Sequence, residues 1–126
     1  SKFSHTPLEP IAEIAQTQVD NAFLERMSRI IEENVANPEL NVAFLAEKMG
    51  ISRSSLFNKI RGLVDVTPNE MIQLVKLKKG AKLLKEGNYR ISEISYMVGF
   101  SSPSYFAKCF QKQFGVKPMD FVAAES

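Results

Sequence analysis

The chain has 126 residues, of which 44% are hydrophobic and 24% are charged. This composition is typical of a globular protein with a buried core, and it excludes an intrinsically disordered chain. No apolar run is long enough to span a membrane, so the sequence predicts a cytoplasmic location without membrane contact, while an anchor elsewhere in a longer parent protein stays open. A single cysteine, Cys109, excludes an intrachain disulfide, and no cluster of metal ligands or cofactor-binding motif is visible.

The net charge of +2 is divided unevenly along the chain. Residues 1–47 carry three basic and eight acidic side chains, a balance of −5, whereas residues 48–126 carry 13 basic and six acidic ones, a balance of +7. A basic imbalance of this kind is typical of a surface that binds phosphates. The isoelectric point of about 8.7 lies below that of strongly basic nucleic-acid binders, so charge supports DNA binding without deciding it.

The first 19 residues contain Pro7 and Pro10 and are interpreted as a linker or arm from an upstream domain. We expect the chain to be an excised fragment, since its first residue is Ser rather than Met. Asp20 can cap a helix whose apolar residues recur with the helical period as far as Val35.

A first helix-turn-helix is predicted next. Asn41 is a suitable N-cap, and Leu40 before it can contact Leu45 inside the helix. Gly50 can adopt the left-handed conformation of a sharp turn, and Ser52 can cap the second helix. This second helix buries Leu56 and Ile60 and leaves its other faces available for contact.

Thr67, Pro68 and Glu70 form a capping-box pattern that predicts a long helix ending at Gly87. At 1.5 Å per residue, roughly 18 residues would span about 27 Å. Gly80 in its interior indicates close packing against a neighbouring helix.

The helix-turn-helix pattern is then repeated. Gly50 recurs as Gly99, an offset of 49, whereas Leu56 and Pro68 recur as Phe106 and Pro118, an offset of 50. One residue is therefore inserted between the glycine and the second helix of the second copy. Ser102 and Pro103 are expected to open that helix. Lys117 replaces the capping threonine, so a short final helix is predicted.

The stretch Ile91–Phe106, continued by Lys108, Phe110 and Lys112, resembles the DNA-binding domain of the AraC/XylS family of transcription regulators. The resemblance covers roughly residues 20–122, and with Ser52–Leu56 and Lys76–Lys79 it is most similar to the C-terminal output domain of hybrid two-component regulators. It implies an all-α domain of seven helices, with two helix-turn-helix lobes joined by a long linking helix. The expected bounds are about 20–66 for lobe one, 67–86 for the linking helix and 88–124 for lobe two, within a domain covering 20–126.

By family position, the second helix of each lobe would contact DNA. The side chains expected to contact bases are Ser54, Ser55, Phe57, Asn58, Ser104, Tyr105, Ala107 and Lys108. Those expected to contact the DNA backbone are Ser52, Arg53, Lys59, Arg61, Ser102 and Lys112. Asn58 stands where the family often has Arg, which favours adenine over guanine as its partner.

Several side chains allow a structural interpretation beside the functional one. The five lysines of the linking helix are interpreted as a solvated face rather than a phosphate track: Lys76, Lys78, Lys79, Lys82 and Lys85. Tyr105 could contact a thymine methyl or pack against its lobe, and partial burial is favoured for Phe57. Cys109 and the five methionines are interpreted as core residues.

The sequence therefore predicts sequence-specific binding of double-stranded DNA by a transcription regulator. Two different recognition helices would enter successive major grooves and cover about 20 base pairs of tandem, non-identical elements. RNA polymerase is an expected partner; the full-length protein is expected to be a homodimer and this fragment a monomer. No catalytic constellation or cofactor is expected, and the alternative is a helical protein–protein interaction module without DNA affinity.

Overall fold

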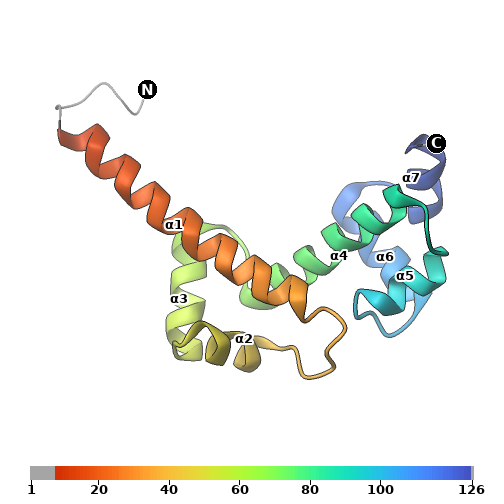
Figure 1. Ribbon diagram of the computed structural model, residues 1–126, viewed down its shortest axis with the longest axis horizontal. Coiled ribbons are helices and arrows are strands. Elements are labelled where there is room, and N and C mark those ends of the chain that lie inside the picture. The colour runs from red at the N-terminus through yellow and green to blue at the C-terminus, as the bar shows by residue number, and fades with distance from the viewer. Residues whose placement is uncertain (1–7, 126) are drawn as a thin grey trace.

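The computed structural model describes residues 8–125, with side chains described for residues 17–124. Within this range the chain forms seven α-helices and no strand, in two groups at opposite ends of a long central helix (Figure 1). The helices are α1 (Leu8–Glu33), α2 (Val42–Met49), α3 (Arg53–Leu63), α4 (Pro68–Glu86), α5 (Ile91–Met97), α6 (Pro103–Phe114) and α7 (Pro118–Glu125). This confirms the predicted all-α fold class.

The first helix begins at Leu8, thirteen residues before the start expected after the Asp20 cap. The predicted start after Asp20 is therefore wrong, and residues 8–19, interpreted as a linker or arm, are helical, while Pro7 lies outside the described residues. Proline is tolerated in the first turn of a helix, where its missing N–H has no partner to lose, and Pro10 is the third residue of α1. The start of α1 consequently projects away from the rest of the molecule (Figure 1).

Lobe one consists of the second half of α1 with α2 and α3. The Asn41 side chain accepts a hydrogen bond of 2.8 Å from the Phe44 N–H, which confirms the predicted cap of α2. Gly50 ends this helix with φ 74°, the left-handed conformation that the turn was expected to require. The core of the lobe is mainly aliphatic and includes Met27, Ile31, Leu45, Leu56 and Ile60.

Helix α4 connects the two lobes and contributes to both cores. Its start has the predicted capping box: Thr67 Oγ1 accepts from the Glu70 N–H at 3.1 Å, and Glu70 accepts from the Thr67 N–H at 2.8 Å. Met71, Ile72 and Val75 belong to the core of lobe one, whereas Leu77 and Leu84 belong to that of lobe two. Helix α4 is therefore part of both cores rather than an exposed connection between the lobes.

Lobe two consists of α5, α6 and α7 packed against the second half of α4. Its core is rich in aromatic rings, with Phe100, Phe106 and Phe110 all buried. Gly80 of α4 faces Phe106, and a Cβ built there would lie 2.9 Å from the Phe106 ring. This confirms the close packing that the glycine predicted. Helix α7 has eight residues, as short as expected.

The two lobes touch where the turn of lobe two meets the end of α1. Gly99 has φ 84°, and a Cβ at this position would collide with the carbonyl oxygen of Val35. The contact is possible only because Gly99 has no side chain, and it brings the turn of lobe two against the backbone that follows α1.

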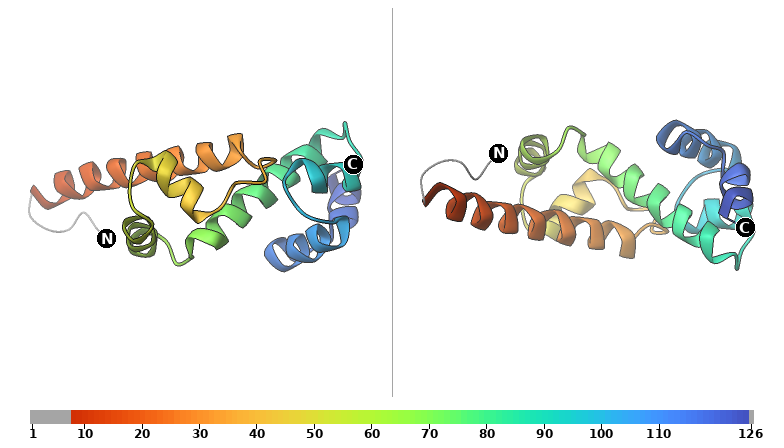
Figure 2. Two further views of the ribbon diagram at one scale, coloured as in Figure 1. Left: turned by 90° about the horizontal axis from the view of Figure 1, so that it is seen from below. Right: turned by 90° about the horizontal axis from the view of Figure 1, so that it is seen from above.

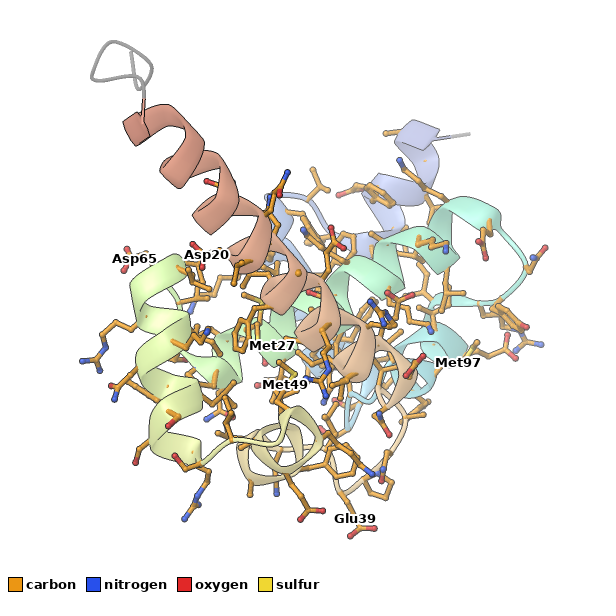
Figure 3. All side chains as sticks on the ribbon, turned by 60° about the vertical axis from the view of Figure 1, so that its left-hand side comes forward. Asp20, Met27, Glu39, Met49, Asp65 and Met97 are labelled. Atoms are coloured by element: carbon orange, nitrogen blue, oxygen red, sulfur yellow. The ribbon has the colours of Figure 1, made fainter. Side chains whose placement is uncertain are left out.

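The methionines were only partly predicted correctly. Met27, Met49 and Met71 are buried, and Figure 3 shows Met27 and Met49 among the helices of lobe one. Met97 is half-buried, but Met119 on α7 is 71% exposed and so is not a core residue. Cys109 is buried, as expected.

Candidate nucleic-acid interface

The second helices of the two lobes, α3 and α6, lie on the same side of the molecule. Figure 2 shows both toward the edge of the molecule opposite α1, with α3 beside the start of α4 and α6 across the second half of α4. Helix α4 has 19 residues, which corresponds to a length of about 28 Å at 1.5 Å per residue. Successive major grooves on one face of DNA recur every ~34–36 Å, a spacing that two lobes held apart by such a helix can match.

A serine caps the start of each of these helices. Ser52 Oγ accepts a hydrogen bond from the Ser55 N–H, and Ser102 Oγ accepts one from the Tyr105 N–H, both at 3.1 Å. The Ser52 hydroxyl also bonds the Ser55 hydroxyl at 3.0 Å. These bonds hold both helix ends in place, and Ser54 and Ser55 are both exposed on this turn.

The outward face of α3 lies opposite the buried Leu56 and Ile60. Ser54, Asn58 and Arg61 follow one another on this face at helical spacing, and all three are exposed. The Arg61 guanidinium lies 4.7 Å from the centre of the Phe57 ring, which is 36% exposed. This cation–π contact orients Arg61, and it agrees with the partial burial predicted for Phe57.

The outward face of α6 is the counterpart of that of α3. Ser104 and Lys108 are exposed on it, and Lys112 is exposed one turn further along. The structure adds Gln111, which is exposed and falls on the same face as Ser104 and Lys108. The sequence contained the signal for Gln111, because the offset of 50 pairs it with Arg61, which was predicted. Ala107 is half-buried beside this face.

Lys59 lies on a different side of α3 from these residues. Its ammonium group is 4.9 Å from the centre of the Phe23 ring of α1. The offset of 50 pairs Lys59 with Cys109, which is buried in lobe two. Lys59 is therefore directed toward its own lobe, and a phosphate contact there stays a prediction, as it does for the exposed Arg53 at the start of the helix.

Tyr105 packs against its own lobe while keeping half of its surface in solvent. Its ring centre is 5.8 Å from that of Phe100, and the side chain is 47% exposed. Interaction with the Cys109 thiol raises the pKa of the Tyr105 hydroxyl. The packing alternative is thus observed, and the thymine contact stays a prediction.

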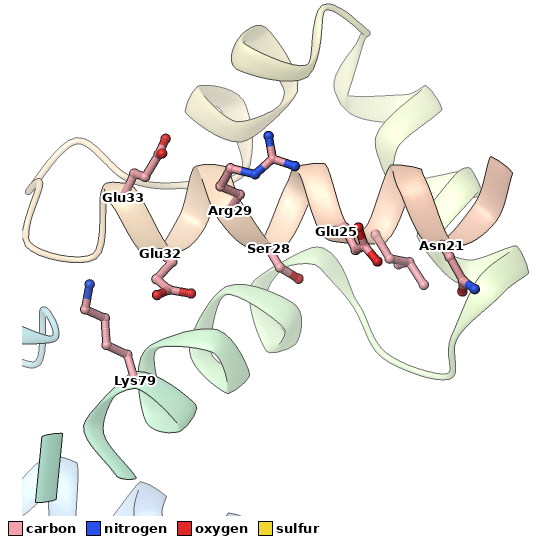
Figure 4. A pocket seen from close by; sticks show the side chains of 8 residues that line it. Asn21, Glu25, Ser28, Arg29, Glu32, Glu33 and Lys79 are labelled. Carbon is pink, nitrogen blue, oxygen red and sulfur yellow. The ribbon is translucent and has the colours of Figure 1, made fainter. Parts of the chain in front are cut away.

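The lysines of α4 do not form a single solvated face. Lys78, Lys82 and Lys85 are exposed, as predicted, and Lys79 is half-buried. Figure 4 shows Lys79 extending from α4 toward the side of α1 that carries Glu32, across a pocket of about 560 Å³. Lys76 was placed wrongly on the solvated face: it is half-buried in a groove between the lobes, and this burial lowers the pKa of its ammonium group.

Helices α3 and α6 carry five basic side chains and no acidic one, whereas acidic and basic side chains meet between α1 and α4. Glu25, Glu32 and Glu33 of α1 line this pocket together with Arg29 and with Lys79 of α4 (Figure 4). Lys108 and Lys112 lie on α6 and Arg61 lies on α3, outside this pocket. A duplex that approaches α3 and α6 therefore meets two helices whose charged side chains are all basic.

The described residues contain neither a cluster of metal ligands nor a membrane-spanning helix. No group of three or more His, Cys, Asp or Glu side chains in that part of the chain could bind a metal ion. Likewise, none of the helices from Leu8 to Glu125 is long and apolar enough to cross a membrane.

Comparison with known proteins identifies the same architecture. A family model described as a helix-turn-helix domain matches residues 45–124. Histidine kinase P4 of Formosa agariphila is 42% identical over 121 residues, which are 96% of this chain but only 9% of the kinase. The chain therefore spans about a tenth of the length of that relative.

Two solved structures have the same fold. A transcriptional regulator from Chromobacterium violaceum with an AraC-type DNA-binding domain superimposes with a TM-score of 0.77 at 23% identity, over 89% of this chain and 96% of that one. The DNA-binding domain of AdpA, solved in complex with a target DNA, gives a TM-score of 0.69 at 24% identity, over 80% of this chain and 90% of that one.

Proposed function

Because the chain belongs to the AraC-type family of helix-turn-helix domains, we propose that it binds double-stranded DNA sequence-specifically as the output domain of a transcription regulator. The observation that carries this proposal is the placement of α3 and α6 on one side of the molecule (Figure 2). Both helices turn a polar face outward, away from their own cores. The AdpA domain, which has this fold, was solved with DNA bound.

The two recognition helices contact DNA through equivalent positions of the repeat. On α6, Lys108 and Gln111 reach base edges or phosphates in one major groove; on α3, Asn58 and Arg61 do so in the next. The two sets differ in sequence, so the two half-sites differ and lie in tandem rather than as a palindrome. The capped helix starts at Ser52 and Ser102 approach phosphates and fix the register.

We also propose that the domain belongs to a longer two-component regulator. The support is the relative named as a histidine kinase, of which the chain covers only a small part. In such a protein the continuous helix α1 connects the upstream part directly to the core of lobe one, through Met27 and Ile31. The full-length protein is then a homodimer in the cytoplasm that contacts RNA polymerase. Pairing two DNA-binding domains in one dimer raises the effective concentration of the second domain at its DNA site.

A salt titration tests DNA binding directly. The domain is titrated with a random pool of ~25-base-pair duplexes, and bound duplexes are selected and sequenced. We expect affinity to fall steeply with added salt, because each neutralised phosphate releases counterions. A flat response, or no binding to any duplex, contradicts the proposal and favours a protein–protein interaction module.

A further inference from the structure

A groove of about 400 Å³ runs between the two lobes, and we call it the inter-lobe groove. Its polar lining comes from three elements that are distant in sequence: Asn41, Asn69, Gln73, Lys76, Ser101 and Tyr105. Among the residues described as lining it, none is acidic. The groove therefore contains one cation, Lys76, surrounded by neutral hydrogen-bonding groups.

Lys76 differs from the other lysines of α4 in its surroundings. It is half-buried, and its Cε lies against Gly99, 3.4 Å from where a Cβ would be. Burial lowers the pKa of Lys76, which means that the charged form is less well solvated here than in water. A partly desolvated cation with no carboxylate lining its groove is stabilised by an incoming anion.

The neighbouring groups can complete such a site. The Asn41 side-chain oxygen already accepts the Phe44 N–H, which leaves its NH₂ group as a donor. Asn69 and Gln73 lie on the same helix as Lys76, two turns and one turn before it, respectively. Ser101 is the residue inserted in the second repeat, so this hydroxyl has no counterpart in lobe one. Amide and hydroxyl donors around a lysine are typical ligands of a DNA phosphate.

The position of the groove indicates which phosphate. One wall includes Ser101 and Tyr105, at the start of α6, and the opposite wall includes Asn41, at the start of α2. A duplex that fills its major grooves with α3 and α6 must pass the region between the lobes. There its sugar-phosphate backbone crosses from one major groove to the next.

Resting on the proposed DNA binding, we propose that the inter-lobe groove binds a backbone phosphate between the two half-sites, with Lys76 as its charged ligand. This contact ties the spacing of the half-sites to the fixed arrangement of the lobes. It adds affinity without reading sequence, so it acts equally on every duplex that spans both lobes.

The first test compares two lysines of the same helix. Lys76→Gln should weaken binding of the selected duplex about five-fold and reduce the salt slope by about one. Lys82→Gln removes the same charge from an exposed position, so its affinity and salt slope should stay within two-fold of those of the wild-type domain. Lys76→Arg keeps the charge and should keep the salt slope. Equal behaviour of Lys76→Gln and Lys82→Gln, with all variants folded by circular dichroism, overturns the inference.

The second test changes the DNA instead of the protein. Neutral methylphosphonates replace the phosphates midway between the half-sites, which should weaken the wild-type domain but have little further effect on Lys76→Gln. Additive losses would show that Lys76 does not bind these phosphates. If wild-type protein binds with a steep salt dependence while Lys76→Gln is unchanged, this inference fails and DNA binding stands. If wild type binds no duplex, the proposed function itself fails.

Discussion

Lobes one and two are built on the same repeat but fill their cores differently. Lobe one is mainly aliphatic, with Leu56 where lobe two has Phe106. The Phe106 ring packs edge-on against Phe100 at 5.3 Å between centres, and it occupies space left by Gly80 of α4. In the core of lobe two, a large ring beside a glycine fills the space that branched side chains fill in the core of lobe one. The two copies of the repeat therefore share their helix arrangement but pack their cores with different side chains.

The turn glycines show the same divergence. Gly50 and Gly99 both have positive φ, but no atom would come within 4 Å of a Cβ at Gly50. At Gly99 the Val35 carbonyl occupies that space. Gly50 is therefore required only by its local conformation, whereas Gly99 is required by conformation and by the contact between the lobes.

The largest expected effect is a difference in stability between alanine substitutions at the two turn glycines. Gly99→Ala should destabilise the domain by about 3 kcal/mol, combining left-handed strain with a clash. Gly50→Ala should cost only the strain, about 1 kcal/mol. Urea denaturation of both variants measures the difference. Equal losses would mean that the contact with Val35 contributes nothing to stability.

The second prediction compares the recognition helices. Lys108→Ala should weaken specific DNA binding by about 2 kcal/mol, because it removes a charged contact from the outward face of α6. Asn58→Ala, its counterpart on α3, should weaken binding without changing the salt slope, since asparagine is uncharged. Fluorescence anisotropy at several salt concentrations separates the two. Unchanged affinity and slope for Lys108→Ala would exclude it from the interface.

The third prediction sharpens the packing difference with two helical glycines. Gly80→Ala should lower stability by about 1 kcal/mol, because the clash with Phe106 exceeds the gain in helix propensity. Gly62→Ala is the control: no atom lies within 4 Å of a Cβ there, so it should raise stability by up to about 1 kcal/mol.

Combining Gly80→Ala with Phe106→Leu separates a clash from an effect on the helix alone. The double variant should be more stable than the sum of the two single losses predicts, because the smaller side chain leaves room for the new methyl group. Strictly additive losses in thermal denaturation would contradict the proposed pairing of glycine and ring.

The smallest effect concerns the helix starts. Hydrogen bonds from Thr67 lower the pKa of Glu70 below its usual value of 4.5. A carboxyl whose pKa is lowered by folding stabilises the protein above its unfolded pKa, and this contribution disappears as pH falls through the folded value. Glu70→Gln should therefore reduce the fall in the free energy of unfolding below about pH 5, because this is the range in which such a carboxyl group titrates. An unchanged pH profile would argue against the capping box.

Local signals in the sequence predicted most of the fold. The caps at Asn41, Ser52 and Thr67 depend on neighbouring residues alone, and the structure confirms them. The start of α1 was missed because the segment with Pro7 and Pro10 was interpreted as a linker or arm, although proline is also common in the first turn of a helix. Local pattern does not distinguish these two cases.

The candidate interface was predicted less completely, for a different reason. The faces of α3 and α6 follow from helical spacing, and Gln111 could have been found from its repeat partner Arg61. Lys76 and Lys59 could not be placed in this way. Their surroundings depend on Gly99 and Phe23, which approach them only in the folded chain. Side chains directed by tertiary contacts lie beyond what spacing alone predicts.

The central claim is that both lobes engage one duplex in successive major grooves. Hydroxyl-radical footprinting on a selected duplex tests it most directly. We predict two protected regions on the same face of the DNA, about 10 base pairs apart, with Lys108→Ala weakening one and Asn58→Ala the other. A single protected region, affected by only one of these substitutions, would contradict the account.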